Sequence, residues 1–356
     1  METMQGKRLP ITDLEHIVSH TRPLWSMLDG QRLFITGGTG FFGIWLLEAL
    51  VYARQTFGLD LQATVLSRAP DAFLRRFPHL AGHPALSWLT GQVQDFEFPQ
   101  QKHHHIIHAA AETHVRIPPT PLLEQFDTLV QGTRRVLDFA RHTQAQNVLI
   151  TSSGAIYGPQ PPNLTHVPES HSGGPDCADT AMLYAEGKRC AELLAALHAG
   201  QYGQSVKIAR CFAFVGPYLP LNKHFAIGNF INDVLRDQDI HIQGDGTPLR
   251  SYLHAADLVI WLLTILLQGR SIHPYNVGSD QALSIAELAR HVATSQPGQV
   301  RQVRQVRIAR PPEAGKPPAR YVPDVSRARE ELGLTVRIPL TDAIHRTLCW
   351  HLQKSN

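Results

Sequence analysis

Residues 36–43 read TGGTGFFG, between the apolar run QRLFIT at 31–36 and the helical pattern FFGIWLLEALVYA at 41–53. A glycine-rich motif is typical of a ligand-binding turn only where it follows a strand and precedes a helix, as this one is predicted to do. Gly37 permits the tight turn, Gly40 lets a pyrophosphate approach the backbone, and Gly43 lets the helix pack close to the sheet. The helix N-terminus then offers free N–H groups to the phosphates. The motif predicts a dinucleotide site; the alternative is a turn without a ligand.

The alternation of strand and helix continues beyond the glycine turn. Apolar strand-like runs stand at 61–67, 104–111 and 147–153, with helical patterns between them. Near-continuous apolar strands of this kind indicate a parallel sheet covered on both faces. The predicted fold is therefore α/β, a Rossmann-like doubly wound parallel sheet with a smaller C-terminal substrate-binding part. We expect a helical N-terminal extension over 1–30, the NAD(P)-binding domain over 31–210, and over 211–356 mainly the substrate-binding part, with some segments returning to the core.

Composition excludes several classes of protein. The 33 basic and 30 acidic side chains give a net charge of +3, too even for a nucleic-acid partner. The four cysteines form no CxxC pair, so neither a disulfide framework nor a zinc site is expected. The adjacent residues His103 to His105 would point in alternating directions, a poor geometry for any metal.

The chain also lacks the signals of membrane insertion and secretion. Its longest apolar run, 259–267, is about half the ~20 residues of a membrane span and predicts a buried helix. The first 30 residues are too rich in charge for a secretory signal. We expect a cytoplasmic protein with reduced cysteines and no membrane partner, and we consider a homodimer as its assembly.

The end of the second strand bears on cofactor choice. An NAD site usually presents Asp or Glu there to the ribose hydroxyls. This chain has Ser67 and Arg68, and a guanidinium would pair with the 2′-phosphate of NADP. The alternative is an exposed arginine without a ligand, so NAD also stays open as the cofactor.

Three further residues form a candidate catalytic group. Tyr184 and Lys188 are four residues apart and share one face of a predicted helix. A tyrosine needs a neighbouring cation to exchange protons near neutral pH, and Lys188 supplies one. Ser153 follows the apolar strand NVLI, at the sheet edge where ligands of open α/β folds bind. On its own the Tyr/Lys spacing is weak, because both residues are common on helix surfaces.

In this order, the glycine loop, TSSGAIYG at 151–158 and YAEGK at 184–188 resemble the extended short-chain dehydrogenase/reductase family, in its nucleotide-sugar epimerase/dehydratase branch. The likeness covers nearly the whole chain. It includes RCFAFVGP at 210–217, GDGTPLRSYLHAADLV at 244–259, PYNVGS at 274–279 and YVPDVSRAREELGL at 321–334.

The resemblance implies hydride transfer between a sugar carbon and a nicotinamide. Tyr184 would be the acid or base, Lys188 would hold the cofactor ribose, and Ser153 would orient the sugar oxygen. The implied substrate is a nucleotide-sugar, contacted by Arg250 at its diphosphate and by Asn229, for which a structural role is equally open. The expected cofactor-binding residues are Gly37, Thr39, Gly40, Phe41, Phe42, Gly43, Ser67, Arg68, Ala109, Ala110 and Lys188.

The departures from the family pattern narrow the chemistry. Dehydratases of this branch carry an Asp-Glu pair just after the serine, where this chain has Gly154 and Ala155. Xylose-forming decarboxylases carry a Glu, and carbon-3/5 epimerising relatives a thiol, at the position of Ala155. An Asn usual in the 210–217 segment is Ala213, and an Asp usual after the third strand is Gln92, so sugar and adenine contacts do not transfer wholesale.

The leading hypothesis is an NADP-dependent reductase of a nucleotide-bound keto sugar. The nearest alternative is a C4 epimerase that retains NAD, since both reactions need only Ser153, Tyr184 and Lys188. An alternative of another class is a non-catalytic dinucleotide sensor or scaffold, against which the intact Tyr and Lys pair argues.

Overall fold

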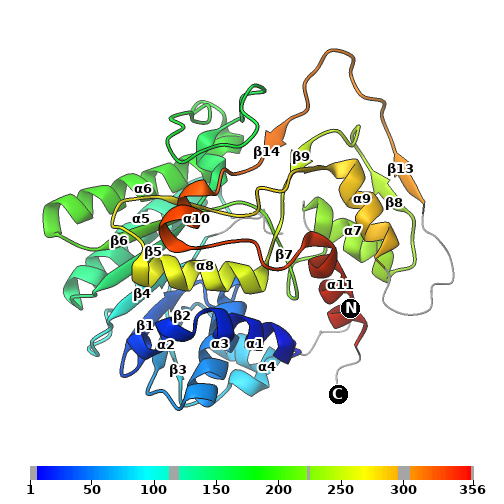
Figure 1. Ribbon diagram of the computed structural model, residues 1–356. Helices are drawn as coiled ribbons and strands as arrows, with labels where there is room; N and C mark the ends of the chain where they lie inside the picture. The colour runs from blue at the N-terminus through cyan, green and yellow to red at the C-terminus, as the bar shows by residue number, and fades with distance from the viewer. Residues whose placement is uncertain (1–5, 112–119, 223–224, 296–304, 354–356) are drawn as a thin grey trace. The chain divides into compact units, whose positions relative to one another are not determined.

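A computed structural model describes residues 6–111, 120–222, 225–295 and 305–353. The chain divides into two compact units, each built from three segments (Figure 1). The first contains Met1–Ile156, Pro175–Arg210 and Val259–Tyr275. The second contains Tyr157–Gly174, Cys211–Leu258 and Asn276–Asn356. Segments far apart in the sequence therefore build each unit.

A seven-stranded sheet in the order β11-β6-β5-β4-β1-β2-β3 has most of its residues in the first unit, whereas β11 continues from that unit into the second. The pairs β1–β2, β2–β3, β1–β4 and β4–β5 are parallel. The strand bounds are β1 Arg32–Thr36, β2 Gln62–Ser67, β3 Leu86–Thr90, β4 His105–His108, β5 Asn147–Ser153, β6 Val206–Cys211 and β11 Tyr275–Val277. The chain order along the sheet reverses between β1 and β4, which is where open α/β folds bind ligands.

Two helices precede the first strand and others connect the strands, as the predicted doubly wound α/β fold requires. The helices are α1 Ile11–His20, α2 Arg22–Leu28, α3 Phe41–Phe57, α4 Pro70–Arg76, α5 Leu122–His142, α6 Leu183–Tyr202 and α8 Ala255–Gln268, with short 3-10 turns η1 Pro78–Leu80, η2 Gly154–Tyr157 and η3 Thr180–Met182. Two helical predictions are confirmed: the N-terminal extension forms α1 and α2, and the apolar run 259–267 lies within α8, which is buried from Ala255 to Leu266.

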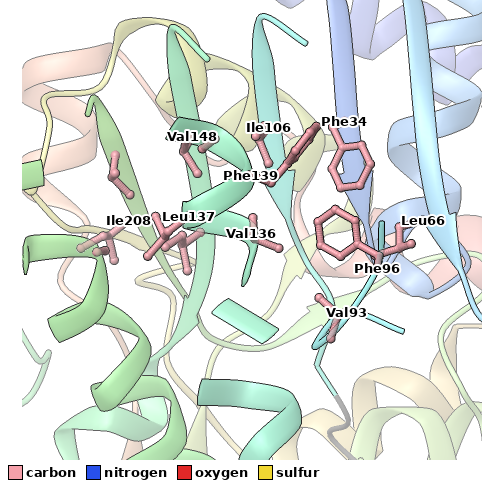
Figure 2. Packing of buried hydrophobic residues seen from close by; sticks show 14 residues of the cluster. Phe34, Leu66, Val93, Phe96, Ile106, Val136, Leu137, Phe139, Val148 and Ile208 are labelled. Carbon is pink, nitrogen blue, oxygen red and sulfur yellow. The ribbon is translucent and has the colours of Figure 1, made fainter. Parts of the chain in front are cut away.

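Figure 2 shows how α5 covers one face of the sheet. Its side chains Val136, Leu137 and Phe139 pack against Phe34 of β1 and Ile106 of β4, and all five are fully buried. Side chains of the opposite strand face, including Leu33, Ile35 and Ile107, are equally buried. Because successive strand residues point to opposite faces, burial of both sets shows a sheet covered on both sides.

The second unit contains shorter elements. Its helices are α7 Ala226–Leu235, α9 Ile285–Thr294, α10 Ser326–Leu332 and α11 Leu340–Leu352, and its strands are β7 Phe214–Val215, β8 Ile240–Ile242, β9 Leu249–Arg250, β10 Leu253–His254, β12 Leu283–Ser284, β13 Val306–Ile308 and β14 Arg320–Tyr321. They pair as β10-β7, β12-β9-β14 and β13-β8.

The fully buried amide of Asn276 joins distant segments of the second unit. Its Nδ2 donates to the carbonyl oxygens of Val167 and Asp324, both at 2.9 Å, and its Oδ1 accepts from the Tyr157 hydroxyl at 2.8 Å. Val167 also forms an isolated bridge with Pro323. A buried amide with its donors and acceptor satisfied stabilises one arrangement of these segments.

Among the described residues, no helix has both the length and the apolar character that crossing a membrane requires. The predicted cytoplasmic location stays a prediction.

Candidate active site

The glycine turn has the geometry that the sequence predicts. Gly37 has φ +73°, and a Cβ there would lie 2.4 Å from the carbonyl oxygen of Ala109. The carbonyl of Gly37 accepts the Gly40 N–H at 3.0 Å, and α3 begins at the next residue. A Cβ on Gly43 would lie 2.3 Å from the backbone of Gly38, so α3 can pack onto the turn only because residue 43 is glycine. The N–H groups at the N-terminus of α3 are therefore available to a ligand that approaches the backbone of the glycine turn.

A cavity of about 240 Å³ lies along the carboxyl ends of the strands in this unit. Its lining residues are Thr36, Gly37, Thr39, Gly40, Leu66, Ser67, Arg68, Gly91, Val93, Gln94, Ala109, Ala110, Ala111 and Thr128. It thus extends from the glycine turn past the ends of β2, β3 and β4 to helix α5. This is the crevice where the strand order reverses, and the glycine backbone leaves room for a pyrophosphate, so the residues present fit a dinucleotide.

Arg68 is the only charged residue among those lining the cavity in the described part of the chain. It is exposed and follows directly on Ser67, the last residue of β2. The Ser67 hydroxyl accepts the Ala69 N–H at 3.3 Å, which shapes the backbone around Arg68. An exposed guanidinium at this place can meet a phosphate without a large loss of hydration.

His108, at the end of β4, is buried between the cavity and helix α5. The Thr133 hydroxyl donates to the Leu129 carbonyl oxygen at 2.6 Å, so it accepts from His108 Nε2 at 3.1 Å. His108 Nδ1 then accepts from the Thr36 hydroxyl at 2.8 Å. Burial, with a smaller effect of the Lys188 charge, lowers the pKa of His108 to about 3. His108 is therefore neutral with its proton on Nε2, and its Nδ1 holds the Thr36 hydroxyl at the start of the glycine turn.

His103 and His105, in the same region, are core residues. His103 is fully buried and packs its ring against Phe34 and Phe139. Burial lowers the pKa of His103 and of His105 to about 4. In the part of the chain that the structure describes, no group of His, Cys, Asp or Glu side chains is arranged to hold a metal ion.

Lys188 joins helix α6 to the end of β5. It is 2% exposed, and its Nζ donates to the Thr151 carbonyl oxygen at 2.6 Å. The same Nζ lies 5.9 Å from the centre of the Tyr184 ring, one helical turn earlier. Ser153 is buried two residues after Thr151, and its Oγ accepts the Ala155 N–H at 3.1 Å. The structure thus gathers the predicted catalytic group at one strand end.

Two features position α6 that the sequence did not reveal. A Cβ on Gly187 would lie 2.6 Å from Leu129 Cδ1, so glycine allows α6 to approach α5. One turn after Lys188, the Glu192 carboxylate accepts from the Ser152 hydroxyl at 2.5 Å and from Arg210 at 2.8 Å. Glu192 therefore links α6 to β5, beside Ser153.

The predicted substrate residues Asn229 and Arg250 belong to the second unit. Asn229 lies in α7 and is half-buried. Arg250 ends β9, donates to the Leu249 carbonyl oxygen at 2.9 Å, and places its guanidinium 5.9 Å from the centre of the Tyr321 ring. Their proposed contacts with a sugar nucleotide stay predictions.

Seven of the predicted cofactor-binding residues line the cavity, namely Gly37, Thr39, Gly40, Ser67, Arg68, Ala109 and Ala110. Phe41, Phe42 and Gly43 form the first turn of α3 instead, and Lys188 points to Thr151. Sequence reasoning missed Thr36, Leu66, Gly91, Val93, Gln94, Ala111 and Thr128. Two parts of this set had a signal: Thr36 begins the glycine motif, and Gln92 already marked an unusual segment after β3.

The model of the NAD dependent epimerase/dehydratase family matches residues 33–278, which include the glycine turn, the cavity and the Ser153, Tyr184 and Lys188 group. The chain belongs to this family. The resemblance drawn from its motifs is thereby confirmed, and so are its classification as an enzyme and its dependence on a nicotinamide dinucleotide.

Individual members of the epimerase/dehydratase family are distant relatives. UDP-glucuronic acid decarboxylase 3 of Arabidopsis thaliana is 26% identical over 88% of this chain and 87% of its own length. A dTDP-glucose 4,6-dehydratase of Streptomyces niveus is 27% identical over 90% and 93%. The structure of a dTDP-glucose 4,6-dehydratase from Streptomyces venezuelae, with NAD bound, has a TM-score of 0.72 and 26% identity over 90% of this chain and 97% of that one. These relatives catalyse different reactions, so the family alone does not choose between them.

Proposed function

We propose that this protein is an NADP-dependent reductase of a nucleotide-bound keto sugar. One observation carries the proposal. Tyr184 and Lys188 lie close together beside Ser153, whereas η2, the turn after Ser153, has Gly154 and Ala155, which offer no acid, base or thiol. Side chains at that turn would be needed to remove water from the sugar. The residues present support a reaction confined to one hydride and one proton.

The bound dinucleotide supplies the hydride that reduces the keto carbon. Ser153 orients the carbonyl oxygen of the substrate, and Tyr184 gives its phenolic proton to that oxygen, so that an alcohol forms. The nearby Lys188 ammonium favours the phenolate that remains, and solvent returns the proton. Lys188 is held for this role by the Thr151 carbonyl oxygen.

Arg68 supports NADP rather than NAD as the cofactor. It is the charged residue in the lining at the end of β2, where the adenosine ribose of a dinucleotide is expected. An exchangeable NADPH delivers net reducing equivalents, which a reductase needs. The second candidate function, a C4 epimerase with retained NAD, uses the same catalytic group and keeps the cofactor bound between turnovers.

The deciding experiment begins with the absorbance spectrum of the purified protein. A reductase is expected to lose its cofactor on purification and then to oxidise NADPH in the presence of one or more nucleotide-linked 4-keto sugars. A tightly held nicotinamide together with interconversion of C4 epimers would favour the epimerase. Tight dinucleotide binding without turnover of any nucleotide-sugar would contradict both and favour a sensor. Molecular mass in solution tests the homodimer.

A further inference from the structure

The N-terminal extension precedes residues 33–278, which the family model matches, and the proposed reaction gives it no role. Its helices α1 and α2 are nevertheless tightly packed in the first unit. Ile17, Trp25 and Leu28 are fully buried, and α1 packs against α3 (Figure 1). The extension is therefore an integral part of the unit that contains the glycine turn.

Residues 6–10 form an N-terminal strap between α4 and α3. The N–H of Gly6 donates to the carbonyl oxygen of Arg76, the last residue of α4. Three residues later, the N–H of Leu9 donates to Glu48 Oε2 of α3 at 3.2 Å. One short stretch of backbone is thus hydrogen-bonded to both helices.

Glu48 is the side chain on which these contacts depend. It is 4% exposed, and its other oxygen, Oε1, accepts from His79 Nε2 at 2.9 Å. His79 lies in η1, which begins one residue after α4 ends. Burial of a carboxylate is costly unless hydrogen bonds replace those with water, so Glu48 requires both donors. It therefore joins α3 to the strap and to the segment that follows α4.

Both helices begin at the proposed cofactor contacts. Helix α3 begins directly after Gly40 of the glycine turn, and α4 begins at Pro70, two residues after Arg68. Because hydrogen-bonded helices are stiff elements, a fixed arrangement of α3 and α4 also fixes the separation between the turn and Arg68. The pyrophosphate and the 2′-phosphate of NADP are joined covalently through one ribose, so both contacts form together only at the right separation. A site prearranged at that separation binds NADP more tightly.

We propose that Glu48, held by the N-terminal strap and His79, is a positioning residue that sets the separation between the glycine turn and Arg68. It thereby sets the preference for NADPH over NADH. This inference rests on the NADP site of the proposed function. NADH contacts the glycine turn but has no 2′-phosphate for Arg68, so a changed separation weakens the binding of NADPH alone.

Titration calorimetry of Glu48→Leu with NADPH and NADH tests the proposal. The variant removes the acceptor of Leu9 and His79, so NADPH affinity is expected to fall about 10-fold, while NADH affinity stays within about twofold. Glu48→Gln keeps an acceptor for Leu9, and its NH₂ group can donate to the other tautomer of His79, so it is expected to retain the preference. Glu15→Leu makes the same change at an exposed residue of α1 and is the matched control, expected to behave as the wild type.

A double variant shows whether Glu48 acts through Arg68. In Arg68→Asp the phosphate contact is already lost, so the addition of Glu48→Leu is expected to change NADPH affinity by less than about twofold. Gly6→Val acts from the other end of the strap, because a Cβ there would lie 2.6 Å from Phe77 Cδ1 and displace the strap from Arg76. It is expected to lower the NADPH preference with Glu48 intact, and it keeps the test decisive if Glu48→Leu does not fold.

An unchanged ratio of NADPH to NADH affinity in folded Glu48→Leu would overturn the inference. An equal fall of both affinities would do the same, because it indicates general destabilisation of the unit, and so would additive effects of Glu48→Leu and Arg68→Asp. Failure of the proposed function gives different results. Equal wild-type affinities for the two cofactors would overturn the NADP site and this inference with it, whereas a preference for NADPH without reduction of any keto sugar would overturn only the reaction.

Discussion

Lys188 and Thr151 are joined by a hydrogen bond of 2.6 Å from the ammonium of α6 to a carbonyl oxygen of β5. Because Lys188 is almost completely buried, water could not replace this hydrogen bond if it broke, and the buried charge would be less stable. The position of its charge relative to Tyr184 and Ser153 is therefore set by the backbone.

The first prediction concerns the Tyr184 hydroxyl. In Tyr184→Phe the ring and its packing remain, but the proton that balances the hydride is lost. We expect kcat to fall roughly 10²- to 10⁴-fold while dinucleotide affinity stays within about threefold. Stopped-flow absorbance of the nicotinamide measures the first quantity and calorimetry the second. Full activity of the variant would eliminate Tyr184 as the acid.

Lys188→Met provides the contrast to this result. It removes the charge that favours the phenolate and the group proposed to hold the cofactor ribose. Rate and dinucleotide affinity are expected to fall together, whereas Tyr184→Phe changes the rate alone. A Lys188 variant with unchanged affinity would limit the lysine to the proton step.

The second prediction concerns Arg68 and cofactor choice. Arg68→Asp removes a charge-assisted contact with the 2′-phosphate, which is expected to weaken NADPH binding by on the order of 1.5 to 3 kcal/mol and to leave NADH nearly unaffected. Arg75→Asp is the control, because it makes the same charge change at an exposed residue outside the cavity lining. Equal binding of NADH and NADPH by the wild type would remove the role proposed for Arg68.

The third prediction separates two glycines of the same turn. Gly40→Val places a branched side chain where the pyrophosphate should lie, so dinucleotide binding is expected to be lost while the protein stays folded. Gly37→Ala forces a Cβ to 2.4 Å from the Ala109 carbonyl oxygen at φ +73°, so thermal stability should fall first. Circular dichroism and cofactor titration on both variants check this. Normal NADPH affinity in Gly40→Val would show a turn without a ligand.

The fourth prediction is a loss of stability in mild acid. Burial lowers the pKa of His108 from 6.5 to about 3, so below pH 6.5 the unfolded chain binds a proton that the folded protein does not. The contribution of His108 to stability is therefore complete above pH 6.5 and falls as the pH drops toward 3, by about 1.4 kcal/mol per pH unit, and His103 and His105 add to the same acid sensitivity. Urea unfolding at several pH values measures this slope. It should be shallower in His108→Asn, and an identical slope in the variant would assign the acid sensitivity elsewhere.

Local signals in the sequence predicted much of the first unit. The glycine turn, the alternating strands and the Tyr184 to Lys188 spacing all depend on neighbours in the chain. The Glu192 link and the hydrogen bond from Leu9 to Glu48 depend instead on residues that meet only after folding, 40 and 39 positions apart. Glu192 by itself is indistinguishable from a surface residue of an amphipathic helix.

The second unit was less predictable for a related reason. Strands such as β9 and β14 contain two residues each, too few to show an alternation of apolar and polar side chains. Their pairing is decided by hydrogen bonds between segments that are distant in the sequence. The sequence therefore indicated turns and breaks there, but not the small sheets between them.

The hydrogen bonds between Val167 and residues 322–324 can form only late in the synthesis of the chain on the ribosome. Val167 donates to and accepts from the backbone of Val322 and Asp324, which are synthesised more than 150 residues later. At roughly 5 to 20 residues per second, the segment after Tyr157 leaves the ribosome about 8 to 30 s before its partners. During that interval the glycine turn and its sheet can already form, so the nascent chain acquires the proposed cofactor site while the rest of the enzyme is still incomplete.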